Sequence, residues 1–254
     1  MDILLKQEDK FKYIEQGEGE VMLLLHGLFG ALSNWKDVID HFSKRYKVVI
    51  PIIPIFETNI LKLSVDGLAD FIYDFVVYKK LTKINLLGNS LGGHIGLVFI
   101  KKHPELINSL VLTGSSGLYE SAFGASYPKK GDKSYIRERI SLTFYDPKST
   151  TDDLVEEVYE ILQDRMKVLR ILTMAKSAIR HNMRKDLPSF SQPTCLVWGL
   201  QDTITPPNVA EEFQELLPDS ELHFLDHCGH AAMMERPHEF NIIIDDFYHK
   251  IFQK

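Results

Sequence analysis

The sequence predicts an α/β fold in which helices cover both faces of a doubly wound, mostly parallel sheet. Short apolar runs alternate with longer segments of helical periodicity, which is the order of repeated strand–helix–strand units. Several of the short runs are unbroken stretches of Val, Ile and Leu, as expected for parallel strands that are buried on both faces. One long segment between two strands has only helical patterns, so we expect a helical insertion at one end of the sheet.

Seven segments have the length and composition of strands. They are Phe11–Gln16, Val21–Leu25, Lys47–Ile52, Ile84–Leu87, Ser109–Thr113, Thr194–Trp198 and Glu221–Leu225. The predicted helices outside the insertion are Val65–Lys80, Leu91–His103, Pro207–Leu217 and Pro237–Phe252. In the first of these helices, apolar residues recur at the three- and four-residue spacing of a buried helix face. The prolines fit the helix ends, because Pro207 opens the third helix and Pro104 follows the second.

The helical insertion is expected to span residues 119–187, because no strand pattern appears between Tyr119 and Leu187. Gly, Pro and polar residues separate its helical segments. A chain of 254 residues can bury a large core as one unit. We therefore expect a single domain over residues 1–254, with a core made of 1–118 and 188–254 and a helical cap made of 119–187.

Composition excludes several classes of protein. The chain is 44% hydrophobic and 25% charged, as in ordinary globular proteins, and its net charge of −6 gives no general affinity for nucleic acid. No apolar run approaches the ~20 residues that cross a bilayer, and the first residues lack an apolar signal segment. Two cysteines are too few for a disulfide framework or a four-thiolate zinc site. We expect a cytoplasmic protein with no integral membrane segment, no nucleic-acid partner and no metal.

The best candidate for chemistry is Ser90, in the segment Gly88-Asn89-Ser90-Leu91-Gly92 between a predicted strand and a predicted helix. A serine on so sharp a turn is strained, and side chains two residues to either side would collide with neighbouring backbone. Glycine at both positions removes the collision and leaves the hydroxyl exposed at the carboxyl end of the strand. A glycine-rich turn without a catalytic role would contain the same elements, but the setting favours a nucleophile.

A serine hydroxyl needs a base to remove its proton, so a histidine partner is expected. Of the ten histidines, His230 is the best placed, because it follows the last predicted strand and precedes the last predicted helix. His227 is the second choice. The two histidines could also form a metal-binding pair, but the sequence around them offers no further cluster of ligands.

The base needs an acid to orient it, and in this architecture the acid lies between the serine and the histidine in the chain. Asp202 has this position, just after the predicted strand Thr194–Trp198. Asp202 could also serve only as a turn or helix-capping residue before Pro206. Asp226 is a weaker candidate because it is only four residues from the histidine.

Two backbone N–H groups are expected to stabilise the oxyanion that forms when a serine attacks a carbonyl. The N–H of Leu91 lies at the start of the helix after Ser90, and the N–H of Leu28 lies in the turn after a buried strand. His26 opens the same turn, and we expect its side chain to shape the loop rather than to take part in the chemistry.

Together these segments resemble the α/β-hydrolase superfamily over nearly the whole chain. The resemblance implies that Ser90, Asp202 and His230 act as nucleophile, acid and base. It also implies that the amides of Leu28 and Leu91 form the oxyanion hole and that the insertion is the family's helical cap. A small-molecule acyl substrate and the absence of any cofactor follow from the same resemblance.

Within this superfamily, the segments 26–35, 88–93 and 229–241 are similar to those of meta-cleavage-product C–C hydrolases, small carboxylesterases and the menaquinone-pathway synthase. The similarity to the C–C hydrolases implies a substrate contact at Asn34. Those enzymes often have tryptophan directly after the catalytic histidine. This chain has Ala231 there, which weakens the similarity to the C–C hydrolases. Many relatives also have an Asp-x-x-Gly-x-Gly-x-Ser turn where this chain has the apolar segment 51–57, which we expect to pack against the core rather than to line a pocket.

A basic stretch in the insertion bears on the substrate. Residues 165–185 contain seven cations and no acid. The plain interpretation is a solvated basic face, and the alternative is that Arg180 pairs with a carboxylate of the substrate. A basic amphipathic helix can also contact a membrane surface, although the net charge of the chain disfavours it.

We predict a serine hydrolase that cleaves a small-molecule carboxylic ester. His230 deprotonates Ser90, which attacks the acyl carbonyl, and water then releases the acid from the acyl-enzyme. The alternatives are a C–C bond hydrolase of the meta-cleavage-product type and, in another class, a ligand receptor that keeps the same residues but turns over slowly. Cleavage of thioesters or lactones also stays open.

Overall fold

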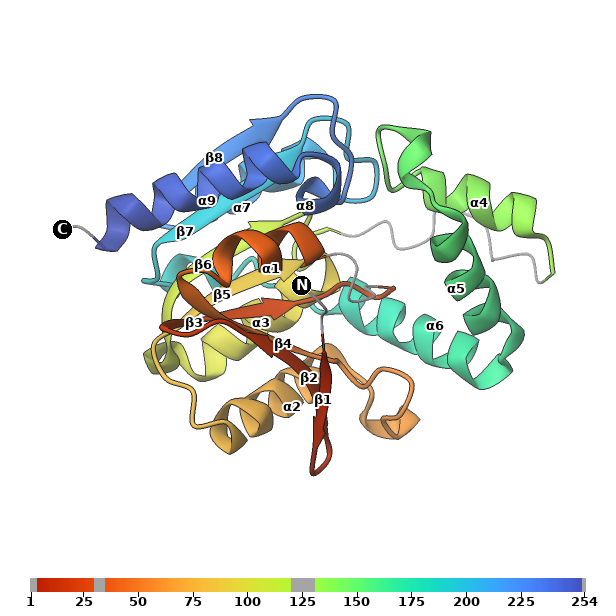
Figure 1. The fold of residues 1–254 in the computed structure, drawn as a ribbon, viewed down its shortest axis with the longest axis horizontal. Coiled ribbons are helices and arrows are strands. Elements are labelled where there is room, and N and C mark those ends of the chain that lie inside the picture. Colours follow the sequence, from red (N-terminus) through yellow and green to blue (C-terminus); the bar gives the residue numbers. More distant parts are fainter. Residues whose placement is uncertain (1–3, 30–34, 120–130, 253–254) are drawn as a thin grey trace.

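The computed structural model describes residues 4–29, 35–119 and 131–252, and its centre is an eight-stranded sheet (Figure 1). The strands are β1 (Leu5–Glu8), β2 (Phe11–Gln16), β3 (Glu20–Leu25), β4 (Tyr46–Pro51), β5 (Ile84–Asn89), β6 (Ile107–Thr113), β7 (Thr194–Gly199) and β8 (Ser220–Leu225). Their order across the sheet is β1-β2-β4-β3-β5-β6-β7-β8. The strands β3 to β8 run parallel, and β1 and β2 pair antiparallel. The predicted α/β class with a doubly wound, mostly parallel sheet is confirmed.

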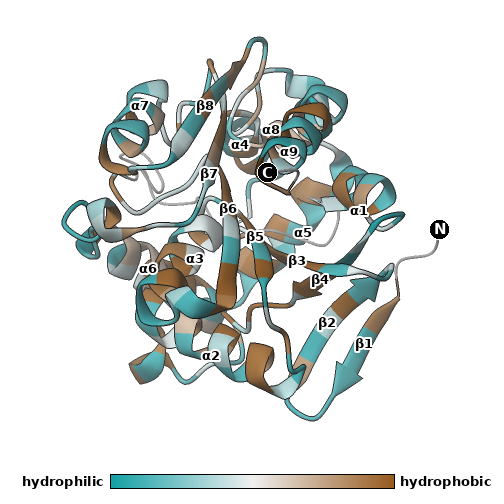
Figure 2. Ribbon diagram, turned by 90° about the vertical axis from the view of Figure 1, so that its left-hand side faces the viewer, coloured by the Kyte–Doolittle hydropathy of each residue, from teal (hydrophilic) through white to brown (hydrophobic). Residues whose placement is uncertain are grey.

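Helices cover both faces of the sheet (Figure 2). One face carries α1 (Lys36–Phe42), α8 (Ala232–Glu235) and α9 (Pro237–Phe252), and the other carries α2 (Val65–Tyr78), α3 (Leu91–Lys102) and α7 (Pro207–Leu216). The remaining helices are α4 (Lys133–Ser141), α5 (Asp152–Gln163) and α6 (Arg165–Arg180), with short 3₁₀ turns at Ile60–Lys62 (η2), Pro104–Leu106, Pro147–Ser149 and Leu187–Ser189. Among the described residues, no helix combines the length and the apolar character needed to cross a bilayer.

The inner strand β3 is rich in apolar residues because it contributes side chains to two cores. In β3, Leu23 and Leu25 belong to the core under α2 and α3, whereas Met22 and Leu24 belong to the core under α1 and α9. All four side chains are fully buried. Successive residues of a strand point to opposite faces, so a strand between two helical layers needs apolar residues at every position.

The differences from the predicted elements lie at the margins of the sheet. The seven predicted strands are present with shifts of a few residues, but β1, α1 and α8 were not predicted. β1 is an edge strand whose residues are mostly exposed, so its sequence lacks the apolar run that marks the other strands. Helices as short as α1 and α8 show too few turns for a periodic pattern.

The described residues of the predicted insertion, 119 and 131–187, contain α4, α5 and α6 and no strand. The helix α6 packs on α2, and the Ser177 hydroxyl accepts a hydrogen bond of 3.1 Å from the Val65 N–H. The loop between α4 and α5 instead contacts the segment around His230, because the His230 N–H donates to the Thr143 carbonyl at 2.8 Å. This segment therefore contacts two separate parts of the chain, namely α2 and the segment around His230. Its role as a cap stays a prediction.

Candidate active site

Ser90 occupies a strained turn between β5 and α3. Its φ of 55° and ψ of −122° lie in a region that L-residues rarely adopt. A Cβ at Gly88 would overlap the backbone of Gly93, and a Cβ at Gly92 would overlap the Leu25 carbonyl oxygen. The two glycines thus allow the close approach of β5, α3 and β3 that the turn requires.

Asp202 and His230 form a buried pair. The distance from His230 Nδ1 to Asp202 Oδ2 is 2.9 Å, and the two residues are 7% and 3% exposed. The other carboxylate oxygen, Oδ1, accepts the backbone N–H groups of Ile204 and Thr205 at 2.8 and 2.9 Å. Because the carboxylate is held at both oxygens, it fixes the orientation of the imidazole. With Nδ1 facing the acid, Nε2 is the ring nitrogen that can take up a proton.

Several contacts place Ser90 and His230 at the same end of the sheet. Asn89 Nδ2 donates to the carbonyls of Thr113 and His230 at 3.0 and 3.3 Å, and the Ser90 N–H also donates to the Thr113 carbonyl at 3.2 Å. A Cβ at Gly114 would lie 2.8 Å from His230 Nδ1, so the imidazole lies directly against this glycine. The turns after β5, β6 and β8 therefore meet around these side chains.

The residues predicted to supply the oxyanion amides lie in segments close to Ser90. Leu91 is the first residue of α3, where backbone N–H groups have no partner within the helix. Leu28 lies in the turn after β3, and a Cβ on the preceding Gly27 would come within 3.3 Å of the Ser90 Cβ. The turn after β3 therefore lies close to the serine, and its role in an oxyanion hole stays a prediction.

His26 joins this turn to the segment after β4. Its Nε2 accepts the Ile53 N–H at 3.1 Å, and its Nδ1 lies 2.9 Å from the Gly27 carbonyl oxygen. The residue is only 7% exposed, and its burial lowers the pKa of His26. The imidazole is neutral and bridges two loops, which agrees with the loop-shaping role expected from the sequence. Ile53 and Ile55 are buried in the core, so the apolar segment after β4 packs inward as expected.

Glu235 anchors the loop that carries His230. Its Oε2 accepts the Gly229 N–H at 2.6 Å, and its Oε1 accepts the N–H groups of Tyr145 and Asp146 at 2.7 and 3.1 Å. One carboxylate in α8 therefore binds both the histidine loop and the segment between α4 and α5.

The other candidate residues lie away from this pair. Asp226 and His227 pair with each other at 3.2 Å on an exposed loop, so neither of these alternatives contacts the buried acid–base pair in the described structure. Arg180 is exposed near the end of α6 and lines a hollow that Ser90, Asp202 and His230 do not line. Asn34 lies outside the described residues.

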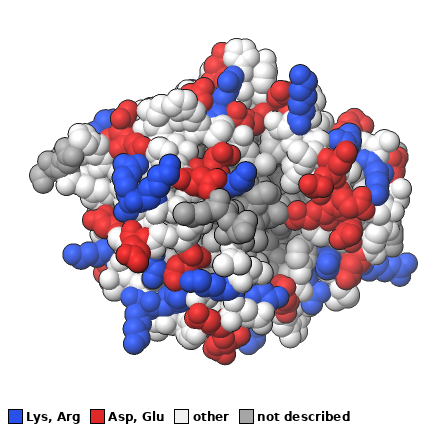
Figure 3. All heavy atoms as spheres, in the orientation of Figure 1, with Lys and Arg blue, Asp and Glu red and all other residues white. Residues whose placement is uncertain are grey.

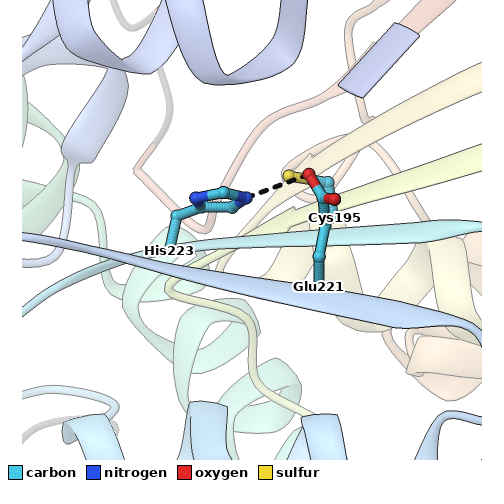
Figure 4. A group of neighbouring side chains, drawn as sticks. All are labelled: Cys195, Glu221 and His223. Atoms are coloured by element: carbon cyan, nitrogen blue, oxygen red, sulfur yellow. Dashed lines mark hydrogen bonds and ion pairs between the residues drawn. The ribbon is translucent and has the colours of Figure 1, made fainter. Parts of the chain in front are cut away.

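Among the described residues, one group has three side chains of the metal-ligating types (Figure 4): Cys195, Glu221 and His223, with ligand atoms within 4.8 Å of one another. His223 Nε2 lies 2.9 Å from Glu221 Oε1, and Lys250 Nζ donates to Oε2 at 2.9 Å. Burial raises the pKa of the Cys195 thiol well above its usual value. The carboxylate therefore already has two partners and the thiol is held in its protonated form, so the group is best described as a hydrogen-bonded cluster near the amino ends of β7 and β8.

Three residues that the sequence did not single out hold the candidate site together. Thr205 donates its hydroxyl to Asp202 Oδ2 at 2.8 Å, Asn89 bonds the histidine backbone, and Glu235 fixes the histidine loop. Thr205 follows Asp202 by three residues, and an aspartate side chain often accepts hydrogen bonds from the backbone N–H groups that follow it in a turn. This spacing could have indicated that the two residues are in contact. Asn89 and Glu235 bond groups that are distant in the chain, which no local pattern indicates.

A protein-family model described as "alpha/beta hydrolase fold" matches residues 20–139 and 153–237 of the chain. Together with the sheet and the strained serine turn, this match defines the class of protein. The chain belongs to the α/β-hydrolase fold family.

Particular relatives within the family have different substrates. A 2-hydroxy-6-oxo-6-(2'-aminophenyl)hexa-2,4-dienoic acid hydrolase of Metapseudomonas resinovorans is 28% identical over 90% of this chain and 84% of its own length. The monoacylglycerol lipase ABHD6 of Bos taurus is 27% identical over 91% of this chain and 76% of its own. A solved α/β hydrolase from the metagenome of Mar Chica lagoon sediments in Morocco is 46% identical, covers 97% of this chain and 98% of its own, and superposes with a TM-score of 0.81. The chain is thus similar both to C–C bond hydrolases and to an ester hydrolase.

Proposed function

We propose that the protein is a serine hydrolase that cleaves a small-molecule carboxylic ester through an acyl-enzyme on Ser90. The observation that carries this proposal is the buried Asp202–His230 pair, with its 2.9 Å hydrogen bond, beside a serine in a strained turn. A serine becomes a strong nucleophile only when a base accepts its proton and a third group orients that base. Family membership and the similarity to a monoacylglycerol lipase support the same reaction class.

The mechanism follows from the roles of these groups. His230 Nε2 takes the proton of Ser90 as the hydroxyl oxygen attacks the acyl carbonyl. The amides of Leu28 and Leu91 stabilise the tetrahedral oxyanion, and Asp202 stabilises the imidazolium. The imidazolium then protonates the leaving alcohol. Water, activated by His230, attacks the acyl-enzyme and releases the acid.

Hydrolysis of p-nitrophenyl esters from acetate to laurate tests this proposal, with Ser90→Ala and His230→Ala as parallel variants. We expect ester cleavage by the wild type with an optimum at one acyl length, and a loss of roughly 10⁶ in turnover in either variant. Wild-type rates in Ser90→Ala would refute the acyl-enzyme. Rates no higher than those of the variants across the whole series would point to another substrate or to a receptor that binds its ligand without rapid turnover.

A C–C bond hydrolase is the second candidate, and the similarity to the Metapseudomonas hydrolase favours it. This activity would use the same serine and histidine on a vinylogous diketone with a carboxylate group. Of the two substrate contacts expected from the sequence, Asn34 stays a proposal, whereas Arg180 lines a hollow that Ser90, Asp202 and His230 do not line. A spectrophotometric assay with a meta-cleavage product, run beside the ester series, decides between the two activities by the ratio of kcat/KM values.

A further inference from the structure

The outer surface of α6 and η2 combines exposed apolar side chains with cations. Four large apolar residues lie on it: Leu61 is 92% exposed, Ile179 58%, Met166 49% and Leu169 45%. The cations Lys62, Lys176 and Arg180 are also exposed. We call these seven residues the α6–η2 surface. Clusters of exposed apolar residues beside charges are typical of interaction sites.

Helical geometry places four of these side chains in one stripe along α6. Met166, Leu169, Lys176 and Arg180 are spaced by three, seven and four residues, which at 100° per residue keeps them within a stripe along the helix. The 3₁₀ turn η2 lies beside this stripe, because Leu63, next to η2, shares a hollow with Lys176 and Arg180. Leu61 and Lys62 are the exposed residues that directly precede Leu63 in the chain.

The hollow itself is suited to an anion. Its volume is about 420 Å³, and Leu63, Thr173, Lys176, Ser177, Arg180 and His181 line it. Leu63 is only 4% exposed and makes an apolar floor. Lys176 and Arg180 also line the hollow. Their ammonium and guanidinium groups are the donors that proteins use to bind phosphates.

Some cations elsewhere on the molecule form ion pairs. Arg184 pairs with Glu212, and Lys101 with Asp186. In the part of the chain that the structure describes, neither Lys176 nor Arg180 has an ion-pair partner, although both are long side chains in a protein of net charge −6.

Acidic residues near the hollow do not cancel these charges. Asp66 lies 3.5 Å from His181, but its other carboxylate oxygen is bound to Lys102 at 3.2 Å. The acids of α5 gather over that helix (Figure 3), whereas α6 leaves α5 and runs toward α2. The second half of α6 thus presents positive charge and apolar groups without an acid on the helix itself.

We propose that the α6–η2 surface docks on an anionic phospholipid bilayer, with a headgroup phosphate in the hollow between Lys176 and Arg180. The apolar side chains of Leu61, Leu169, Met166 and Ile179 would enter the boundary between headgroups and acyl chains. This is how an interfacial helix binds without spanning a membrane, since apolar burial and attraction to anionic lipid add together. The proposal concerns membrane association and does not depend on the ester chemistry of Ser90.

Vesicle co-sedimentation tests it, with phosphatidylcholine vesicles compared with vesicles that also contain phosphatidylglycerol. The full chain is used with Ser90→Ala as background, so that no lipid is hydrolysed and failure concerns this surface alone. Each basic residue near an anionic surface contributes about fivefold in affinity, so the double variant Lys176→Gln with Arg180→Gln is expected to bind roughly thirtyfold more weakly. The double variant Leu61→Ser with Leu169→Ser is expected to lose binding to the anionic vesicles as well.

Matched controls are Lys12→Gln with Lys44→Gln, and Leu5→Ser, which change exposed residues on other elements. These controls are expected to bind as the parent does. Equal binding by the parent and the Lys176/Arg180 double variant, or no binding to either vesicle, overturns the proposal. Calorimetric binding of inorganic phosphate without vesicle binding would instead assign the hollow to a soluble anion. A dimer in light scattering that the leucine double variant abolishes would assign the surface to a second copy of the chain.

Discussion

The hydroxyl of Thr205 lies between the two members of the Asp202–His230 pair. It is 2.8 Å from Asp202 Oδ2 and 3.2 Å from His230 Nδ1, and the residue is fully buried. Oδ2 is also the oxygen that faces the imidazole. A donor fixed on this oxygen limits the movement of the carboxylate, so we assign Thr205 as a positioning residue of the proposed site.

Replacing Thr205 by Val keeps the shape of the side chain and removes the hydroxyl. A hydrogen bond to a charged group contributes about 1.5–3 kcal/mol, so kcat/KM should fall by about tenfold to a hundredfold. Thr205→Ser, which keeps the hydroxyl, should retain most of the activity. Steady-state kinetics of both variants across pH provide the measurement, and equal activity of Thr205→Val and wild type would rule out this role.

Asp202→Asn tests the assignment of the acid. The amide cannot stabilise the imidazolium and favours the wrong tautomer of His230, so turnover should fall by about 10⁴. Asp226→Asn is the matched control, because Asp226 is the alternative acid and lies on an exposed loop 3.2 Å from His227. A large loss in the control together with near-normal activity in Asp202→Asn would reverse the assignment.

Among the helices, one hydrogen bond joins α3 to the residue that follows α6. His94 Nε2 lies 3.0 Å from His181 Nδ1, and His94 is fully buried. Burial, with a smaller contribution from His181, lowers the pKa of His94 to about 3. His94 also lies 3.4 Å from the Ser116 hydroxyl, so the link reaches the turn after β6.

This histidine makes stability depend on pH. Its folded-state pKa of about 3 lies below the usual value, so on acidification the unfolded chain binds the proton first. The free energy of unfolding should therefore fall as the pH drops below about 6.5, by up to about 1.4 kcal/mol per pH unit until the pH approaches 3. Urea denaturation at a series of pH values measures the slope. In the variant His94→Gln, the slope of the free energy of unfolding against pH should be smaller, with a part left over because buried His26 acts in the same direction. An unchanged slope would contradict this role of His94. The variant His249→Gln, which changes an exposed histidine, is the control.

Glu235 connects α8 to two other segments through three backbone N–H groups. Glu235→Gln replaces one acceptor oxygen by a donor that faces an N–H group, so about 2 kcal/mol of stability should be lost. Hydrogen exchange should rise at residues 143–146 and 226–231 in this variant. Glu239→Gln in α9 is the control. Exchange that rises equally in both variants would show that the three hydrogen bonds do not hold these segments.

For the molecule as a whole, the predictable features follow from local chemistry. A strand buried on both faces must be apolar throughout, so β3 and β5 could be found from composition alone. Ser90 and Asp202 could be found because Ser90 directly follows β5 and Asp202 lies three residues after the end of β7. The loops at the carboxyl ends of parallel strands meet in space, and this brings together residues that are distant in the chain.

The features that could not be predicted depend on contacts between distant segments. Glu235 binds the N–H groups of Tyr145 and Asp146, about 90 residues away in the chain, and nothing in the local sequence indicates these partners. The strand β1 forms because it pairs with β2, and its residues are mostly exposed, so no apolar pattern marks it in the sequence. The hollow beside Arg180 likewise depends on how α6 packs against the segment before α2.

Every step of the proposed reaction depends on Ser90 as a nucleophile that His230 activates. Reaction of the protein with an alkyl fluorophosphonate, followed by peptide mass spectrometry, tests it most directly, because the reagent phosphonylates an activated serine whatever the natural substrate. We expect a single adduct on Ser90 that is absent from Ser90→Ala and forms much more slowly in His230→Ala. An adduct on another residue, or equal labelling of wild type and His230→Ala, would contradict it.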